Sequence, residues 1–320
     1  MVPNARFHIG QVPLDPVTLP GAIERIVELA ASGRGGTVYT PNVDHVVVAE
    51  EDDAFRAAYS DVSLSLVDGT PVLWAGRMLG YGLPEKVSGS DLFEPLVAEA
   101  ARRGLSIFLL GGGPGVAELA RDELVRRHPG LNVVGILAPR IDAAGRAENE
   151  EGVIETLRAA KPALIFVACG APKSELFSHR VRASLGSAVF VCVGAAIDFA
   201  AGTARRAPRW MSKVGLEWTY RLVREPRRLA RRYLLRDPKF FVILGRQLLG
   251  GTPAPVLPTA RAEAALEAQP LSHVRPVTDG PLVEAVPESR VVGADELPAQ
   301  SGVQGAELEA RSREKRQGAP

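Results

Sequence analysis

The sequence lacks several features that would by themselves assign a protein to a class. It holds only two cysteines in 320 residues, and no His and Cys cluster has the spacing of a zinc site. Cys169 and Cys192 both fall in apolar runs. We therefore expect them to be reduced core residues of a cytoplasmic protein, and a disulfide framework is excluded.

Long apolar runs are also missing. The longest strongly apolar stretch, 188–197, ends at Asp198, whereas a membrane-spanning helix needs about 20 such residues. Residues 1–10 show no basic start followed by an apolar core, so no secretory signal is expected. The composition favours a soluble α/β or α+β protein over a secreted or integral membrane protein.

The chain as a whole has no excess of charge of one sign. Its formal net charge is +1, which gives no general case for binding nucleic acid. This average conceals a polarised chain. Residues 204–239 hold twelve basic and three acidic side chains, a net charge of +9, and the rest of the chain carries −8.

Aromatic residues are absent from 251–320, where nine prolines recur. Such a segment buries too little apolar surface to offset the entropy lost on ordering. We expect a disordered tail with one short helix near 260–268 and no chemistry of its own.

Before this tail, short apolar runs alternate with longer amphipathic ones. The apolar runs predict buried strands at 37–40, 64–67, 106–110, 132–136, 163–168 and 188–193. The periodicity between them predicts helices at 19–31, 44–59, 71–79, 91–103, 116–127, 153–160 and 175–184. Ser90 is expected to cap the 91–103 helix and Gly104 to end it. This alternation favours a Rossmann-like α/β fold, a mainly parallel sheet with helices on both faces.

Polar residues follow several of these strands, at the edge where such folds bind ligands. Thr40 and Asn42 offer neutral donors to a polar ligand. Asp68 suits a general base, although it could equally cap the next helix. Asp198 could accept a hydrogen bond from a nucleobase or ribose, or cap a helix.

Gly111 to Gly115 follow a strand and open a helix, so their amides could cradle a phosphate. A dinucleotide fingerprint would need a sixth-position glycine, where Val116 stands, and an acid after the next strand, where none occurs before Asp142. A nucleotide-dependent oxidoreductase therefore remains only an alternative. A tight turn without a ligand fits the glycines as well.

The basic segment 204–239 interleaves its arginines with aromatic and apolar residues, and Pro226 divides two helical patterns. This pattern is typical of a membrane-surface helix or a clamp for an anionic ligand, and Arg suits a diphosphate. The alternatives are a solvated basic helix with its aromatics in the core, an RNA-binding element, or a non-enzymatic adaptor for membranes or nucleic acid.

Over about residues 7–244 the ordered motifs resemble the WecG/TagA/CpsF family of glycosyltransferases. The matching segments are Thr-Pro-Asn at 40–42, Leu-Val-Asp-Gly at 66–69, Glu-Lys-Val-Ser-Gly-Ser-Asp-Leu at 85–92, Gly-Gly-Gly at 111–113, Gly-Ala-Pro-Lys-Ser-Glu at 170–175 and Val-Gly-Ala-Ala-Ile-Asp-Phe-Ala-Ala-Gly at 193–202, continued by 206–208, 215–222 and 225–228.

The resemblance implies an inverting hexosyltransferase that builds a cell-surface polysaccharide, teichoic acid or exopolysaccharide. It would move a hexose or N-acetylhexosamine, such as N-acetylmannosamine, from a UDP-sugar to a polyprenyl-diphosphate-linked sugar. No metal and no cofactor are expected, in agreement with the lack of an Asp-x-Asp element. The expected partners are the UDP-sugar, the lipid-linked acceptor and an anionic membrane surface, without nucleic acid and with a homo-oligomer left open. The expected location is cytoplasmic, peripheral on the inner face of the plasma membrane.

The resemblance also implies roles for individual residues, with Asp68 as the catalytic base. The residues expected at the donor or its nucleotide are Thr40, Asn42, Lys86, Gly89, Gly111, Gly112, Gly113, Gly170, Pro172, Lys173, Ser174, Glu175 and Asp198. Those expected at the acceptor diphosphate are Arg206, Arg221, Arg228 and Arg232. Ser174 stands where the family usually has Gln, and Lys86 where it often has Arg, so the donor sugar is less firmly predicted than the reaction.

Together these features predict an α/β catalytic domain over 1–203, a basic helical appendage over 204–250 and a disordered tail over 251–320. The five histidines, at 8, 45, 128, 179 and 273, have no ligand spacing. We expect them to be structural or surface residues.

Overall fold

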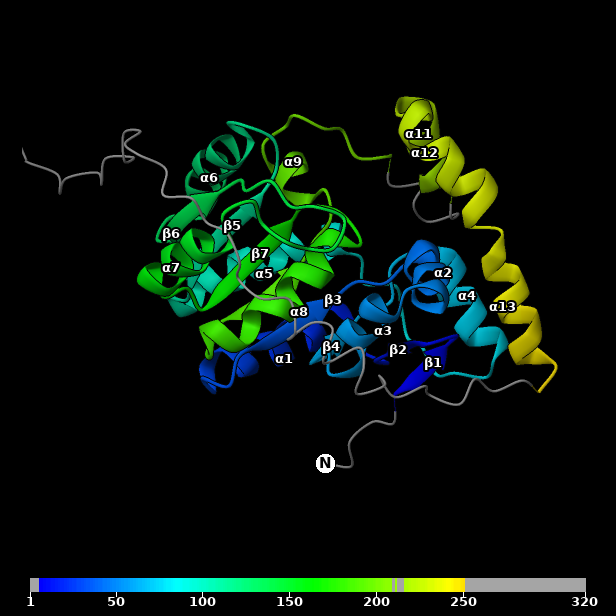
Figure 1. Cartoon of the computed structure of the whole chain (residues 1–320). Helices are drawn as coiled ribbons and strands as arrows, with labels where there is room; N and C mark the ends of the chain where they lie inside the picture. The colour runs from blue at the N-terminus through cyan, green and yellow to red at the C-terminus, as the bar shows by residue number, and fades with distance from the viewer. Residues whose placement is uncertain (1–5, 209–210, 212–215, 251–320) are drawn as a thin grey trace, which may run out of the picture. The chain divides into compact units, whose positions relative to one another are not determined.

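The computed structural model describes residues 6–208, 211 and 216–250 (Figure 1). The chain divides into two units, Met1–Pro270 and Leu271–Pro320, and every described residue belongs to the first. The expected tail over 251–320, with its short helix near 260–268, lies outside the described residues.

A six-stranded sheet forms the centre of the fold, and all its strand pairs are parallel. In spatial order its strands are β4 (Leu64–Ser65), β3 (Gly36–Tyr39), β8 (Val189–Cys192), β7 (Leu164–Ala168), β5 (Ser106–Gly111) and β6 (Asn132–Leu137). All six predicted strands are therefore present. The strand predicted to reach residue 67 ends at Ser65, although Leu66 still donates its N–H to the carbonyl of Tyr39.

Alternate strand residues point to opposite faces of the sheet, and each face is covered by helices. The face with Tyr39 and Phe190 packs against α2 (Val43–Glu51), α3 (Asp53–Ser60), α4 (Thr70–Met78), α7 (Glu150–Ala160) and α8 (Lys173–Leu185). The face with Val38 and Val191 packs against α1 (Leu19–Ala31), α5 (Gly89–Arg103), α6 (Val116–Arg127) and α9 (Ala196–Ala200). The predicted α/β sheet with helices on both faces is confirmed.

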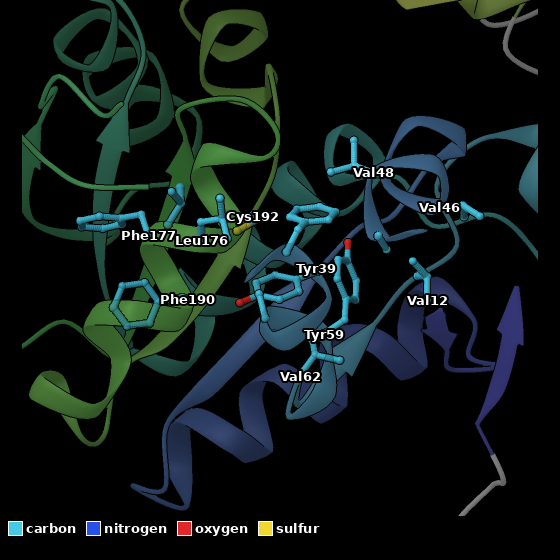
Figure 2. Packing of buried hydrophobic residues seen from close by; sticks show 14 of the residues in the cluster. Val12, Tyr39, Val46, Val48, Tyr59, Val62, Leu176, Phe177, Phe190 and Cys192 are labelled. Atoms are coloured by element: carbon cyan, nitrogen blue, oxygen red, sulfur yellow. The ribbon is translucent and has the colours of Figure 1, made fainter. Parts of the chain in front are cut away.

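Aromatic rings fill the first of these two cores (Figure 2). Tyr39 on β3 and Tyr59 on α3 lie edge to face, with ring centroids 5.2 Å apart. The Tyr39 hydroxyl donates to the backbone carbonyl of Glu175, 3.1 Å away. This contact ties the end of β3 to the first turn of α8, and both elements reach the functional site described below.

The helix predicted over 44–59 is two helices, α2 and α3. Asp52 separates them, with an extended backbone (φ −122°, ψ 110°) and a side chain that accepts a hydrogen bond from the N–H of Phe55. An aspartate that caps a following helix favours a new start over continuation. The single-helix prediction was therefore wrong at this residue.

Ser90 does not cap the helix predicted to begin at residue 91. The cap is Ser88, whose side chain accepts from the N–H of Asp91, and α5 begins at Gly89. A Cβ at Gly89 would lie 2.8 Å from backbone atoms of Val193, so glycine allows this helix start to approach the end of β8. Gly104 does end the helix, in the left-handed conformation (φ 65°), as predicted.

A short hairpin at the start of the chain was not predicted, because its strands have only three residues each. β1 (Phe7–Ile9) pairs antiparallel with β2 (Val12–Leu14). α13 (Lys239–Leu248) packs against β1 of this hairpin and buries Phe240, Ile243 and Leu244. The last helix of the predicted appendage therefore packs into the core.

Between residue 216 and α13, the described part of the appendage contains α11 (Glu217–Arg224), α12 (Pro226–Arg231) and a π-helical turn, η1 (Arg232–Arg236). Pro226 opens α12, as expected for proline in a first helical turn. Within the described ranges, no helix combines the length and apolar character that a bilayer crossing requires.

Candidate active site

A cavity of about 640 Å³ lies beyond the carboxyl ends of the sheet strands, where the sequence predicts a ligand. Residues that follow β3, β4, β5, β7 and β8 line it, together with residues of α11, α12 and η1. It brings together most of the predicted site: Thr40, Asn42, Asp68, Lys86, Gly89, Gly112, Gly113, Gly170, Ser174, Glu175, Asp198, Arg221 and Arg232.

Four predicted residues do not line the cavity: Gly111, Pro172, Lys173 and Arg206. At Gly111 (φ 112°) a Cβ would lie 2.6 Å from the carbonyl carbon of Ala168, so this glycine permits close packing of neighbouring strands. The Lys173 ammonium donates to the backbone carbonyl of Ile141, 2.7 Å away. The side chain of Arg228 lies outside the described residues.

Asp68 follows β4 and is half-buried in the cavity wall. Burial raises the pKa of its carboxyl to about 6, and the charge of Glu217 raises it as well. Arg221, Lys86 and His45 act in the opposite direction. A carboxylate that titrates near neutrality is suited to accept a proton from a substrate hydroxyl.

Backbone and side-chain hydrogen bonds join the ends of three strands around Asp68. The N–H of Asp68 donates to the carbonyl of Pro41, 3.0 Å away, which holds the end of β4 against that of β3. The hydroxyl of Thr40 donates to the carbonyl of Cys192, 3.2 Å away, which holds β3 against β8. Because the buried Thr40 hydroxyl donates its proton to the Cys192 carbonyl, only its oxygen is left, as a hydrogen-bond acceptor for a ligand.

A buried hydrogen-bonded chain runs from Asn42 through His45 to Glu175. Asn42 caps α2 by accepting from the N–H of Asp44 at 3.1 Å. The Nδ1 atom of His45 accepts from the backbone N–H of Asn42 at 3.3 Å and lies 3.0 Å from Asn42 Oδ1, and its Nε2 atom donates to Glu175 Oε1 at 3.3 Å. Both His45 and Glu175 side chains are only 5% exposed, and Glu175 Oε2 has no hydrogen-bond partner among the described residues.

His45 lines the cavity, although the lack of ligand spacing among the histidines predicts a structural or surface role for it. A signal for it does exist in the sequence. It stands three residues after the N-cap Asn42, the position from which a side chain reaches back to the cap.

Lys86 reaches the cavity but is held by Asp91, with 2.6 Å between its Nζ atom and Asp91 Oδ2. Arg206 pairs with the other oxygen of the same carboxylate. Burial alone would raise the pKa of Asp91, but hydrogen bonds from Lys86, Ser88 and Arg206 outweigh it and lower this pKa to about 2. Asp91 therefore stays ionised and fixes both cations beside the start of α5.

Gly112 and Gly113 line the cavity just before α6. Gly112 has φ 82°, which favours glycine. Gly115 is the N-cap residue of α6, and it has no side chain that could cap the helix. The N–H groups of the first turn of a helix attract anions, so this turn suits a phosphate. Asp198, in the first turn of α9, also lines the cavity.

Cys169 also lines the cavity, at the edge of the core rather than inside it as predicted. Burial raises the pKa of its thiol to about 12, with a further contribution from Glu175. The thiol is therefore protonated near neutral pH and poorly suited to act as a nucleophile. In the described ranges, no three His, Cys, Asp or Glu side chains cluster so that they could hold a metal ion.

The ordered motifs and the geometry agree with the comparisons to known proteins. Residues 7–253 match the model of the glycosyl transferase WecG/TagA/CpsF family. A relative from Bacillus spizizenii (strain ATCC 23059 / NRRL B-14472 / W23) is 28% identical over 207 residues, which cover 65% of this chain and 77% of the relative. It is described as N-acetylglucosaminyldiphosphoundecaprenol N-acetyl-beta-D-mannosaminyltransferase.

Proposed function

Because the chain belongs to the WecG/TagA/CpsF family of glycosyl transferases, we propose that it transfers N-acetylmannosamine or a related sugar from a UDP-sugar to a polyprenyl-diphosphate-linked N-acetylglucosamine. The name of the Bacillus relative supports this acceptor and this transferred sugar. With the family established, the protein is a glycosyltransferase. The oxidoreductase and the non-enzymatic adaptor are set aside.

Asp68 is the proposed general base. As an acceptor hydroxyl attacks the anomeric carbon, its proton passes to the Asp68 carboxylate. The new glycosidic C–O bond forms while the bond to the β-phosphate oxygen breaks, and UDP leaves with that electron pair. A single displacement inverts the anomeric centre and needs no covalent enzyme intermediate. The observation that carries this proposal is a half-buried carboxylate in the cavity with a pKa of about 6.

The nucleotide is proposed to lie along the glycine turn before α6. The first-turn N–H groups of α6, beside Gly112 and Gly113, would face the diphosphate. Asp198 would accept a hydrogen bond from the ribose or the base. No metal is proposed at the donor, because the backbone N–H groups of the glycine turn would supply positive charge near the leaving group.

The acceptor is proposed to enter beneath the basic appendage. Arg221 lines the cavity from α11 and suits a diphosphate, since its planar fork can make two parallel hydrogen bonds. The appendage also exposes large apolar side chains, among them Val223, Leu235 and Val242, which are 80%, 70% and 72% exposed. Basic residues beside exposed apolar ones support binding to the anionic inner face of the plasma membrane, where each cation near the surface contributes about 1 kcal/mol.

A transfer assay tests this function. Purified protein is mixed with UDP-N-acetylmannosamine, or with UDP-glucose in parallel, and a short-chain polyprenyl-diphosphate N-acetylglucosamine, with and without EDTA. We expect release of UDP and formation of a disaccharide lipid, both at the same rate with and without EDTA. A strict metal requirement would contradict metal independence, and no transfer with any UDP-sugar would contradict the proposed donor.

A further inference from the structure

Four residues form a continuous hydrogen-bonded chain along the wall of the cavity. They come from α8, from α2 with its N-cap, and from η1. Glu175 contacts His45, His45 accepts from the backbone N–H of Asn42, and the Asn42 side chain accepts from Arg232. Asn42 lies in the middle of this chain, and the appendage reaches its amide through Arg232.

The network fixes which way the Asn42 amide points. Its Oδ1 atom accepts from the N–H of Asp44 at 3.1 Å and from Arg232 Nη2 at 3.0 Å. If the amide were reversed, its NH₂ group would face these two donors, and both hydrogen bonds would be lost. Oδ1 is therefore committed to the protein, and the Nδ2 group is the part of the amide left for a ligand.

The Arg232 side chain lines the cavity but also contacts side chains of the protein. Besides its bond to Asn42, its Nε atom lies 3.3 Å from Asp44 Oδ2, and the Asp44 side chain is 2% exposed. The next arginine of the same turn, Arg236, contacts Asp44 but neither Asn42 nor the cavity. One of the two arginines thus reaches the site, and the other only anchors the turn.

We infer that Arg232 is a positioning residue: when the appendage is docked, it holds the Asn42 amide so that the Nδ2 group donates to an oxygen of the sugar donor. His45, held by Glu175, accepts from the backbone N–H of Asn42 and so supports the same residue from the opposite direction. The appendage thereby completes the donor half of the site as well as covering it. This inference rests on the proposed function, because it takes the ligand to be a UDP-sugar.

A role for Arg232 in binding only the acceptor diphosphate, as the family resemblance implies, makes a different prediction. An arginine that contacts only the acceptor has no effect on donor binding when the acceptor is absent. An arginine that orients Asn42 affects the donor whether or not the acceptor is present. Donor binding without acceptor therefore separates the two roles.

The experiment measures the affinity for UDP-N-acetylmannosamine by calorimetry, without acceptor, in the full-length protein. Arg232→Gln is expected to weaken binding about tenfold, the effect of losing roughly one well-oriented hydrogen bond. The matched control is Arg227→Gln, which makes the same charge change at an exposed position of α12 outside the cavity and is expected to bind like the wild type. If Arg232→Gln binds normally, or if Arg227→Gln weakens binding equally, the inference is wrong.

A double-mutant cycle provides the second readout. If Arg232 acts through Asn42, adding Arg232→Gln to Asn42→Ala should cause no further loss, whereas independent contacts would multiply their effects. If circular dichroism shows that Arg232→Gln is unfolded, Arg232→Lys replaces it, because Lys keeps the charge beside Asp44 but lacks the fork. Failure of the wild type to bind any UDP-sugar would instead contradict the proposed function.

Discussion

Arg236 Nη2 lies 2.5 Å from Oδ1 of Asp44, a carboxylate that is only 2% exposed and that also faces Arg232. This contact joins the basic appendage to the first turn of α2, which carries Asn42 and His45. A buried carboxylate needs such partners because burial removes its water. The same ion pairs that satisfy Asp44 therefore hold the appendage at the cavity.

Replacing Asp44 should loosen this attachment. In Asp44→Ala Arg236 and Arg232 both lose their contact with this carboxylate, so we expect the free energy of unfolding to fall by about 1–3 kcal/mol. Trypsin should also cleave within the arginine-rich appendage sooner than in the wild type. Urea denaturation and timed proteolysis measure the two effects. Asp122→Ala, on the exposed side of α6, is the control and should change neither. If trypsin cleaves Asp44→Ala no faster than the wild type, other contacts hold the appendage.

Much of the fold could be predicted because buried strands in a parallel sheet leave a simple trace, short apolar runs between amphipathic ones. The gathering of Thr40, Asp68 and Asp198 at one edge follows from the same topology, since the ends of parallel strands meet there. Their individual roles stay predictions until they are tested. Capping was less predictable: both Ser88 and Ser90 are of a residue type that caps helices, and Ser88 takes this place, with Gly89 packed closely against Val193.

Contacts between distant segments could not be predicted. Arg232 and Asn42 are 190 residues apart, and the charge pattern alone does not distinguish Arg232 from its neighbouring arginines. The family resemblance selects Arg232 for the acceptor diphosphate, without any indication of the contact with Asn42. Lys173 lies in a family motif, yet its side chain binds the Ile141 carbonyl outside the cavity. A charge pattern indicates that a segment binds something anionic, but the packing of helices decides which side chains reach it.

Asp68→Asn should abolish proton acceptance while preserving shape. We expect turnover to fall by a factor of about 100 or more, with UDP-sugar affinity close to that of the wild type. Steady-state kinetics and calorimetry give the two values. Asp122→Asn serves as the control for a charge change outside the cavity. Unchanged turnover would remove Asp68 from the mechanism.

The same carboxyl should make stability depend on pH. Its pKa is raised in the folded protein to about 6 from an ordinary value of 3.8, so the folded state binds more protons between these values. Stability from this group therefore falls as pH rises from about 4 to 6. Asp68→Asn removes the buried charge and should raise the melting temperature at pH 7.5 more than at pH 4. An equal shift at both pH values would contradict the raised pKa.

Glu217 should set the acid limit of activity. A general base must be deprotonated, so kcat/KM should decline below about pH 6 in the wild type. The charge of Glu217 contributes to the raised pKa of Asp68, and Glu217→Gln should shift the acid limb of the profile to lower pH. Glu155→Gln, exposed on α7, should leave the profile unchanged. An acid limb that stays at the same pH in Glu217→Gln would show that Glu217 does not contribute to this pKa.

The exposed apolar side chains of the appendage should matter at a membrane and not in solution. Val223→Ser and Leu235→Ser remove side chains that are 80% and 70% exposed, so neither should lower the melting temperature. Both should reduce cosedimentation with vesicles containing anionic lipid, because burying each side chain in a bilayer contributes about 1–2 kcal/mol. Leu119→Ser, 53% exposed on α6, is the matched control and should sediment like the wild type.

Turnover with a water-soluble short-chain acceptor should be the same in all three variants, because the protein reaches that substrate without binding a membrane. If Leu119→Ser loses vesicle binding as strongly as Val223→Ser, the apolar face of the appendage is not the membrane contact.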